Sequence, residues 1–505
     1  MNIEGLAHGL ELAADPLLLL MVFGAVVAGV LVGALPGLSS TMATALLLPF
    51  TLAMEPVAAI AVLAALYCAG TYGGSITAIL INTPGAPPAA TTAFDGYPMA
   101  LKGEAGRALG MAAVASAIGG IFSVIVMIVA APALARLAYQ FGPPEYFALA
   151  VFGLSMLAGI SAGNTVKNLL GGAAGVLIAT VGLEITTGVE RFTFGFWELT
   201  EGINFIPVMI GIFAVSELLQ QATVPKLVRK RVAVVAARLP SLDDFKRCAA
   251  TIARSCGIGT FIGILPAEGG TIASIIGYNE AKRFSKHPEE FGHGSIEGIA
   301  GPEAANNAAT GGAMVPTLAL GIPGSGTTAV ILAALIAQGV RPGPALFTEQ
   351  PDLLYTLFWS MLIANLMFLA VGFAGAKLFA RITMIPRTFL WPSVFMLSVV
   401  GSYALATSIV DVWIMLIFGL IGYFMRRHGF SVAPVIIGLI LGGLVETSLR
   451  QSMIMFDQSV LGFFSRPLAL TFFALTLVSL FGRPVRKAIV RRLRERRAGP
   501  REAAG

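Results

Sequence analysis

The sequence predicts an all-α polytopic membrane protein with inverted-topology repeats, broken or re-entrant helices, and about 10–12 transmembrane segments. Hydrophobic residues make up 56% of the 505 residues and charged residues only 12%, whereas an average soluble domain has about 25% charged residues. Apolar runs of about 18 residues or more recur from end to end, and each is long enough to cross a lipid bilayer. A soluble protein of this composition could not cover its surface, so we expect the chain to contact membrane lipid.

The first hundred residues contain apolar runs that are interrupted twice. Pro36-Gly37 interrupts the first run, and residues typical of helix N-termini follow it: Ser39, Ser40 and Thr41. Asn82-Thr83-Pro84-Gly85 ends the next run, and small and polar residues continue to Thr92. Within a membrane, a helix is interrupted only where protein or a water-filled cavity supplies partners for the freed backbone groups, so these breaks indicate a site.

Further apolar spans follow, and basic segments divide the chain. The predicted spans are residues 108–137, 146–163, 168–182, 203–219, 353–377, 389–404, 411–426, 432–445 and 468–481. We therefore predict a first half over residues 1–222, a basic cytoplasmic linker over 223–250, a second half over 251–482 and a basic cytoplasmic tail over 483–505. The N-terminus has no Lys or Arg before the first apolar run, so we expect this run to be retained and not cleaved as a signal peptide.

Residues 263–347 repeat the pattern of the first hundred residues. Gly33-Ala-Leu-Pro36-Gly37 corresponds to Gly263-Ile-Leu-Pro266-Ala267, and Pro84-Gly85 corresponds to Pro323-Gly324. The basic loops place the first copy from outside to inside and the second from inside to outside. Copies in opposite orientation are typical of secondary transporters, whose site lies near the midplane where the copies meet. We expect the Pro323-Gly324 break to face Pro84-Gly85.

The start of a half-helix inside the membrane can hold a carboxylate, because it presents unpaired N–H groups and the positive end of the helix dipole. The alternative is that these small and hydroxyl residues only allow close helix packing. The candidate substrate-binding residues, which follow the breaks in the two copies, are Ser39, Ser40, Thr41, Thr91, Thr92, Gly269, Gly270, Thr271, Ser325, Gly326, Thr327 and Thr328.

Polar side chains within the membrane cost free energy, so their presence there indicates a structural or functional role. Asn82, Asn306 and Asn307 form a candidate sodium site together with the carbonyl ends of the broken helices. Hydrogen bonding between helices is the alternative role for these amides. Glu303 lies at a similar depth, and Glu268 lies within a break.

No enzyme signature was found in the form of a Walker A loop or a His-Glu-x-x-His motif, because the chain lacks both. We predict no catalytic residue, and a gradient of Na⁺ or H⁺ as the driving force. The basic residues lie in short loops and in the tail, which favours membrane topology over nucleic-acid binding. A channel and a membrane-embedded enzyme are the alternatives to a carrier of a small organic anion.

The two repeats also carry a set of motifs that occur together in one transporter family. The motifs are Tyr72-Gly-Gly-Ser75, Asn82-Thr-Pro-Gly85, Asp95-Gly-Tyr-Pro-Met99, Gly106-Arg-Ala-Leu-Gly110, Pro302-Glu-Ala-Ala-Asn-Asn307, Leu320-Gly-Ile-Pro-Gly324 and Pro342-Gly-Pro344. Over nearly its whole length the chain resembles the large membrane subunit of the tripartite tricarboxylate transporters, the TctA-type family. The resemblance implies a bacterial inner-membrane permease that imports tricarboxylates or dicarboxylates with sodium or protons. It also implies two partners, a small four-helix membrane subunit and a periplasmic solute-binding protein.

Overall fold

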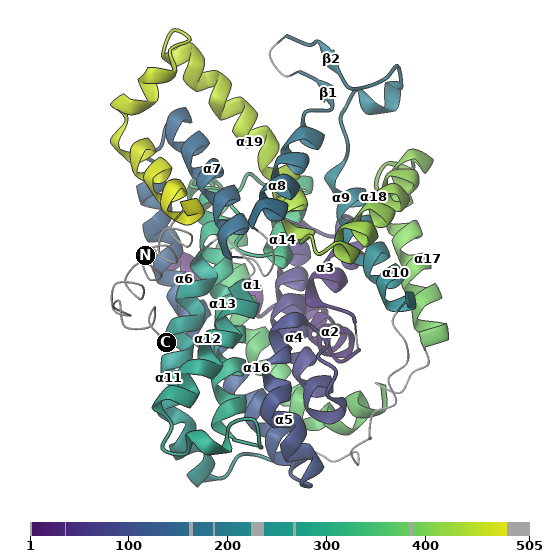
Figure 1. Ribbon diagram of the computed structural model, residues 1–505, viewed down its shortest axis with the longest axis vertical. Helices are drawn as coiled ribbons and strands as arrows, with labels where there is room; N and C mark the ends of the chain where they lie inside the picture. The colour runs from purple at the N-terminus through teal and green to yellow at the C-terminus, as the bar shows by residue number, and fades with distance from the viewer. Residues whose placement is uncertain are drawn as a thin grey trace, which may run out of the picture.

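The computed structural model describes residues 3–35, 37–160, 165–184, 187–223, 237–265, 269–382 and 387–481. Pro36, the break at Pro266, Ala267 and Glu268, residues 224–236 of the basic linker and the basic tail lie outside these residues. Helices make up almost all of the described structure, with one two-stranded sheet, β1 (Gly182–Leu183) and β2 (Glu190–Arg191), paired antiparallel. The prediction of an all-α protein is confirmed (Figure 1).

Eight of the described helices are long and apolar enough to cross a membrane, and four shorter apolar helices accompany them. Large apolar side chains are exposed on the outer helices, as at Leu20, Ile125 and Trp413. A soluble protein would have to cover this much exposed apolar surface, whereas lipid solvates it. The chain is therefore a polytopic membrane protein.

The first copy of the repeat is a helical hairpin followed by a broken helix. Its elements are α2 (Pro16–Gly33), α3 (Ser40–Thr51), α4 (Pro56–Ile81), η1 (Pro87–Ala90) and α5 (Thr92–Leu101). Helix α2 packs along α4, and a Cβ atom added to Gly33 would lie only 2.4 Å from the Gly70 carbonyl oxygen. Helix α4 ends at Asn82, whose φ of 49° is left-handed, and the chain then folds back so that Gly85 contacts Gly74.

The second copy repeats these contacts. Its elements are α11 (Leu242–Ile264), α12 (Gly269–Phe284), α13 (Glu297–Leu320) and α14 (Gly326–Ala337). A Cβ atom on Gly263 would lie 2.6 Å from the Ala309 carbonyl oxygen, as Gly33 approaches Gly70 in the first copy. Helix α13 ends at Gly321 with a left-handed φ of 68°, and Gly324 folds back onto Ala313. Asn82 and Gly321 thus end equivalent helices, and both tolerate a left-handed conformation better than other residues do.

The two copies run in opposite directions, because α4 and α13 cross antiparallel. Asn307 Nδ2 donates to the Cys68 carbonyl at 3.2 Å, and these residues are 239 positions apart. The same offset relates Asn82 to Gly321, so the crossing joins equivalent positions of the two copies. In Figure 1, α4 leads down to α5, whereas α13 leads up to α14. The inverted-repeat pattern recognised in the sequence therefore has a structural counterpart, while the half boundaries at 222 and 251 stay a prediction.

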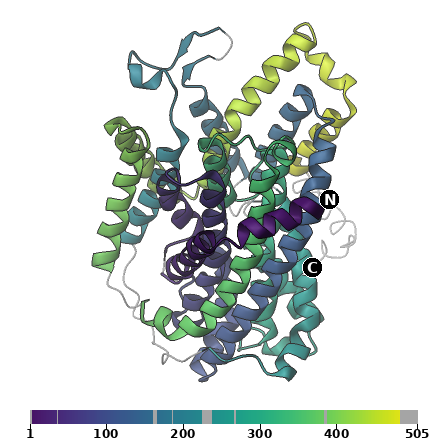
Figure 2. The ribbon, with the colours of Figure 1, turned by 180° about the vertical axis from the view of Figure 1, so that it is seen from behind.

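The remaining helices surround this pair. They are α1 (Ile3–Ala13), α6 (Ala105–Ala138), α7 (Pro143–Ile160), α8 (Thr165–Ala179), α9 (Phe205–Met209), the π-helix η3 (Ile210–Val215), α10 (Ser216–Thr223), α15 (Leu346–Glu349), α16 (Pro351–Ile382), α17 (Arg387–Ala406), α18 (Ile409–Arg427) and α19 (Ala433–Met455), with the short 3₁₀ turns η2 (Trp197–Leu199), η4 (Pro288–Glu290) and η5 (Val460–Ser465). Helix α6 packs on α13 and α16 packs on α4, so each long helix supports the broken helix of the other copy. Helix α1 crosses α16 on the far side of the molecule (Figure 2).

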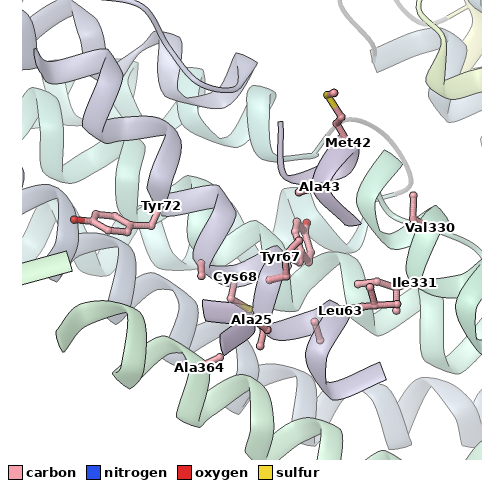
Figure 3. Packing of buried hydrophobic residues seen from close by; sticks show 14 of the residues in the cluster. Ala25, Met42, Ala43, Leu63, Tyr67, Cys68, Tyr72, Val330, Ile331 and Ala364 are labelled. Carbon is pink, nitrogen blue, oxygen red and sulfur yellow. The ribbon is translucent and has the colours of Figure 1, made fainter. Parts of the chain in front are cut away.

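The core lies around the middle of α4. Figure 3 shows Leu63, Tyr67 and Cys68 of α4 surrounded by side chains from α2, α3, α14 and α16. All three are buried, and Cys68 is 0% exposed. Because the helices meet here through Gly and Ala, their backbones approach closely and hold the breaks in fixed positions.

Candidate functional site

The N-termini of α3 and α14 meet in the interior of the molecule. The hydroxyl oxygens of Thr41 and Thr327 lie 2.7 Å apart and share a hydrogen bond. Each helix has a serine N-cap: Ser39 Oγ accepts from the Met42 N–H at 3.2 Å, and Ser325 Oγ accepts from the Thr328 N–H at 3.2 Å. The two breaks therefore present capped helix starts to each other across the interface between the copies.

These caps leave the first N–H groups of both helices unused. The first two residues are Ser40 and Thr41 in α3, and Gly326 and Thr327 in α14. Among the described residues, no hydrogen bond occupies these four backbone N–H groups, because the first N–H groups of a helix have no partner within it. Two helix dipoles also direct their positive ends to the same place, so the arrangement favours an anion.

A cavity of about 490 Å³ opens at this junction and is of the size of small-molecule sites. Nine of the predicted substrate and sodium residues line it: Ser39, Ser40, Thr41, Gly270, Thr271, Asn306, Ser325, Gly326 and Thr327. The second break of the first copy also lines it, from Thr83 to Pro88. Described residues at or after each of the four breaks thus reach one cavity. The direct contact of the α14 start, however, is with Thr41. The sequence had led us to expect Pro84-Gly85 in this place.

Four other predicted substrate residues do not line the cavity. Thr91 shares a hydrogen bond with Ser274, and Thr92 donates to Glu303. Thr328 completes the cap of α14, because its hydroxyl accepts from the Ser325 N–H at 2.8 Å. Gly269 is the buried first residue of α12.

The three asparagines of the candidate sodium site have different surroundings. Asn306 is 2% exposed and lines the cavity, and neither polar atom of its side chain has a partner among the described residues. Asn307 faces the other way and donates to α4, while Asn82 forms the left-handed end of that helix. Of the three, Asn306 is the residue that a ligand in the cavity could reach.

Sequence reasoning missed an ion pair at the wall of the cavity. Arg426, near the end of α18, donates from Nη1 to Glu217 Oε2 at 2.9 Å and from Nε to Ser216 Oγ at 3.1 Å. Gln221 donates to the other Glu217 oxygen at 2.9 Å. Arg426 and Glu217 both line the cavity. In the sequence, Arg426 was placed only at the end of the predicted span 411–426.

The centre of the cavity wall was also missed, although the repeat could have revealed it. Tyr67 and Thr71 of α4 line the cavity beside Asn306 and Thr310 of α13. The repeat relates Tyr67 to Asn306 and Thr71 to Thr310. Both pairs have the separation of 239 positions that also relates Cys68 to Asn307. Asn306 was among the predicted residues, and extending the repeat alignment backward from the breaks would have added Tyr67, Thr71 and Thr310.

Comparison with known proteins finds one matching family and two similar proteins. The family model of the tripartite tricarboxylate transporter TctA family matches residues 19–437. An uncharacterized 52.8 kDa protein in the TAR-I ttuC′ 3′ region of Agrobacterium vitis is 41% identical over 478 residues, covering 94% of this chain and 95% of its own. A second Agrobacterium vitis protein, in the TAR-II ttuC′ 3′ region, is 38% identical over 220 residues, covering 44% of this chain and 91% of its own. No solved structure matches.

Proposed function

The chain belongs to the tripartite tricarboxylate transporter TctA family, and from this premise we propose that it is a secondary active carrier importing a small dicarboxylate or tricarboxylate. A cation gradient drives this uptake, and a solute-binding protein delivers the substrate to the cavity. A small membrane subunit completes the complex, which lies in the bacterial inner membrane with the C-terminus of this chain in the cytoplasm.

The observation that carries the proposal is the meeting of two helix N-termini in one cavity. Four backbone N–H groups, from Ser40, Thr41, Gly326 and Thr327, are available to the two oxygens of a carboxylate. Hydrogen bonds from neutral donors hold the anion without a full positive charge, and a carrier must also release its substrate. Because one helix comes from each copy, a relative movement of the copies would open the carboxylate site to one side or the other.

Arg426 supports a substrate with more than one carboxylate. Its guanidinium group can bind a carboxylate through two parallel hydrogen bonds. In the structure, Glu217 occupies this position. We propose that a second carboxylate of the substrate replaces Glu217 on Arg426, while the first lies between α3 and α14.

Uptake in membrane vesicles tests this proposal against a channel and against an enzyme. The vesicles contain this chain and its small membrane subunit, and the cognate binding protein is added together with labelled acetate, succinate or citrate. We expect saturable accumulation of succinate or citrate that requires a cation gradient. Gradient-independent conductance would indicate a channel, and chemical conversion of the label without accumulation would indicate an enzyme. Either result would overturn the carrier.

A further inference from the structure

Glu303 is a carboxyl group in the interior of the protein that the carboxylate site does not use. It lies on α13, is 0% exposed, and forms no ion pair with any described cation. Ser116 of α6 donates to Oε2 at 2.8 Å, and Thr92 of α5 donates to Oε1. The equivalent position of the first copy, found with the same offset, is Ala64. An ionisable residue at such depth is costly, and the fold does not need one there because the other copy packs with alanine.

A chain of hydroxyl groups links Glu303 to the cavity. Pro88 lines the cavity, and its carbonyl oxygen accepts from Ser274 at 2.7 Å. Ser274 in turn shares a hydrogen bond with Thr91, whose neighbour Thr92 reaches Glu303. Asn306, one turn beyond Glu303 on α13, lines the same cavity. Hydrogen bonds and the peptide bond between Thr91 and Thr92 therefore connect the carboxyl group with the wall of the substrate site.

We propose that Glu303 binds the proton that is transported with the carboxylate, which extends the proposed function by naming its coupling ion. In the conformation described here the carboxyl group is neutral, and the oxygen that carries the proton donates to its hydroxyl neighbour, which accepts in place of donating. When the site opens to the cytoplasmic face, this proton passes to water and leaves a carboxylate. Burial without a counter-ion disfavours that carboxylate, so the group must take up a proton again before it is enclosed.

The surroundings of Glu303 fit a proton better than sodium. The hydroxyl groups of Thr92 and Ser116 contact the two carboxyl oxygens directly, whereas hard cations collect about six oxygen ligands. The titratable groups on the elements packed against this part of α13 include Cys68 and Tyr72 on α4, Asp95 on α5, Cys256 on α11 and Tyr278 on α12. Asp95 is satisfied separately, by Tyr278 and by three backbone N–H groups of residues 292–295.

The variant Glu303→Gln tests the proposal, because glutamine imitates the protonated carboxyl group but cannot release a proton. In the vesicles described above, with labelled succinate and citrate, a gradient of one pH unit coupled to one proton drives about tenfold accumulation. We expect wild type to show it and Glu303→Gln to lose it, while exchange of labelled for unlabelled substrate continues. Glu297→Gln is the matched control: this carboxylate lies on the same helix but accepts from Arg247 at 3.2 Å, and its variant should keep the proton-driven accumulation.

Several results would contradict the inference. Proton-driven accumulation by Glu303→Gln equal to that of wild type would overturn it, and so would accumulation by wild type under a sodium gradient alone. A wild type that accumulates no carboxylate under any gradient would instead overturn the proposed function. If Glu303→Gln fails to fold, Ser116→Ala keeps the carboxyl group but removes a donor to its ionised form. The pH midpoint of exchange should then rise by about half a unit, and an unchanged midpoint would contradict the proposal.

Discussion

Replacing Gly326 by proline would remove one of the proposed substrate contacts and leave the helix intact. Gly326 is the first residue of α14, a position where proline is favoured because its N–H is not used within the helix. The preceding residue, Ser325, is already extended, with φ −157° and ψ 170°, as a residue before proline prefers. The nearest atoms to a Cβ at this position are 3.4 Å away, which is ordinary contact. The substitution therefore deletes a backbone N–H with little strain.

The expected loss of carboxylate affinity follows from the hydrogen bond that Gly326→Pro removes. A hydrogen bond to a charged group contributes about 1.5–3 kcal/mol, so the affinity for the carboxylate should fall about 10- to 100-fold. The stability should not fall, because a compatible glycine-to-proline replacement stabilises a fold by about 0.4–1 kcal/mol through the unfolded chain. Loss of affinity without loss of stability would separate a binding role of the N–H from a structural role.

Calorimetric titration of the purified chain with citrate and succinate measures this affinity, and thermal unfolding without ligand measures the stability. Gly326→Ala is the matched control, because it adds a Cβ in the same place but keeps the N–H; we expect its affinity to stay within about twofold of wild type. Equal affinities of the proline and alanine variants would refute the reasoning that the helix N-termini bind the carboxylate.

The remaining predictions concern the cavity wall and the packing of the breaks. Arg426→Gln should weaken uptake of succinate and citrate by about tenfold or more without the same effect in Arg427→Gln, whose side chain bonds Tyr423 away from the cavity; equal uptake by both variants would remove Arg426 from the site. Gly85→Ala would place a Cβ 2.0 Å from the Gly33 carbonyl oxygen, so its thermal unfolding midpoint should fall far below that of Gly257→Ala, where no atom lies within 4 Å; similar midpoints would show that the break adapts. Asn306→Ala should lower the affinity for substrate but not the stability, since its amide has no partner to lose, and a lower unfolding midpoint in the absence of ligand would argue for a packing role.

Much of this architecture could be predicted from the sequence because proline and glycine mark the breaks directly. Asn82 and Gly321 end α4 and α13 in the left-handed conformation that their residue types allow, and the serines and threonines after the breaks do cap or begin helices. The pattern of breaks was also sufficient to recognise the repeat. The apolar sequence between the breaks adds little information to this comparison.

The spatial pairing of the breaks could not be predicted in this way. It depends on where α4 and α13 cross, at Cys68 and Asn307, and helices built from alanine and glycine can cross at several places. Once the crossing is fixed, the start of α14 lies against α3, and Thr91 and Thr92 lie against Ser274 and Glu303. Arg426 was missed for a similar reason, because a basic residue at a helix end follows the general topology rule.

The central claim is that a transported carboxylate lies between the starts of α3 and α14, and cross-linking tests it most directly. The Thr41 and Thr327 hydroxyls are 2.7 Å apart, so cysteines in the variant Thr41→Cys with Thr327→Cys should form a disulfide under mild oxidation. The cysteines already present, Cys68, Cys248 and Cys256, are buried. We expect citrate or succinate to slow the cross-link, and acetate at the same ionic strength to slow it less. A cross-linking rate independent of every carboxylate would contradict the account.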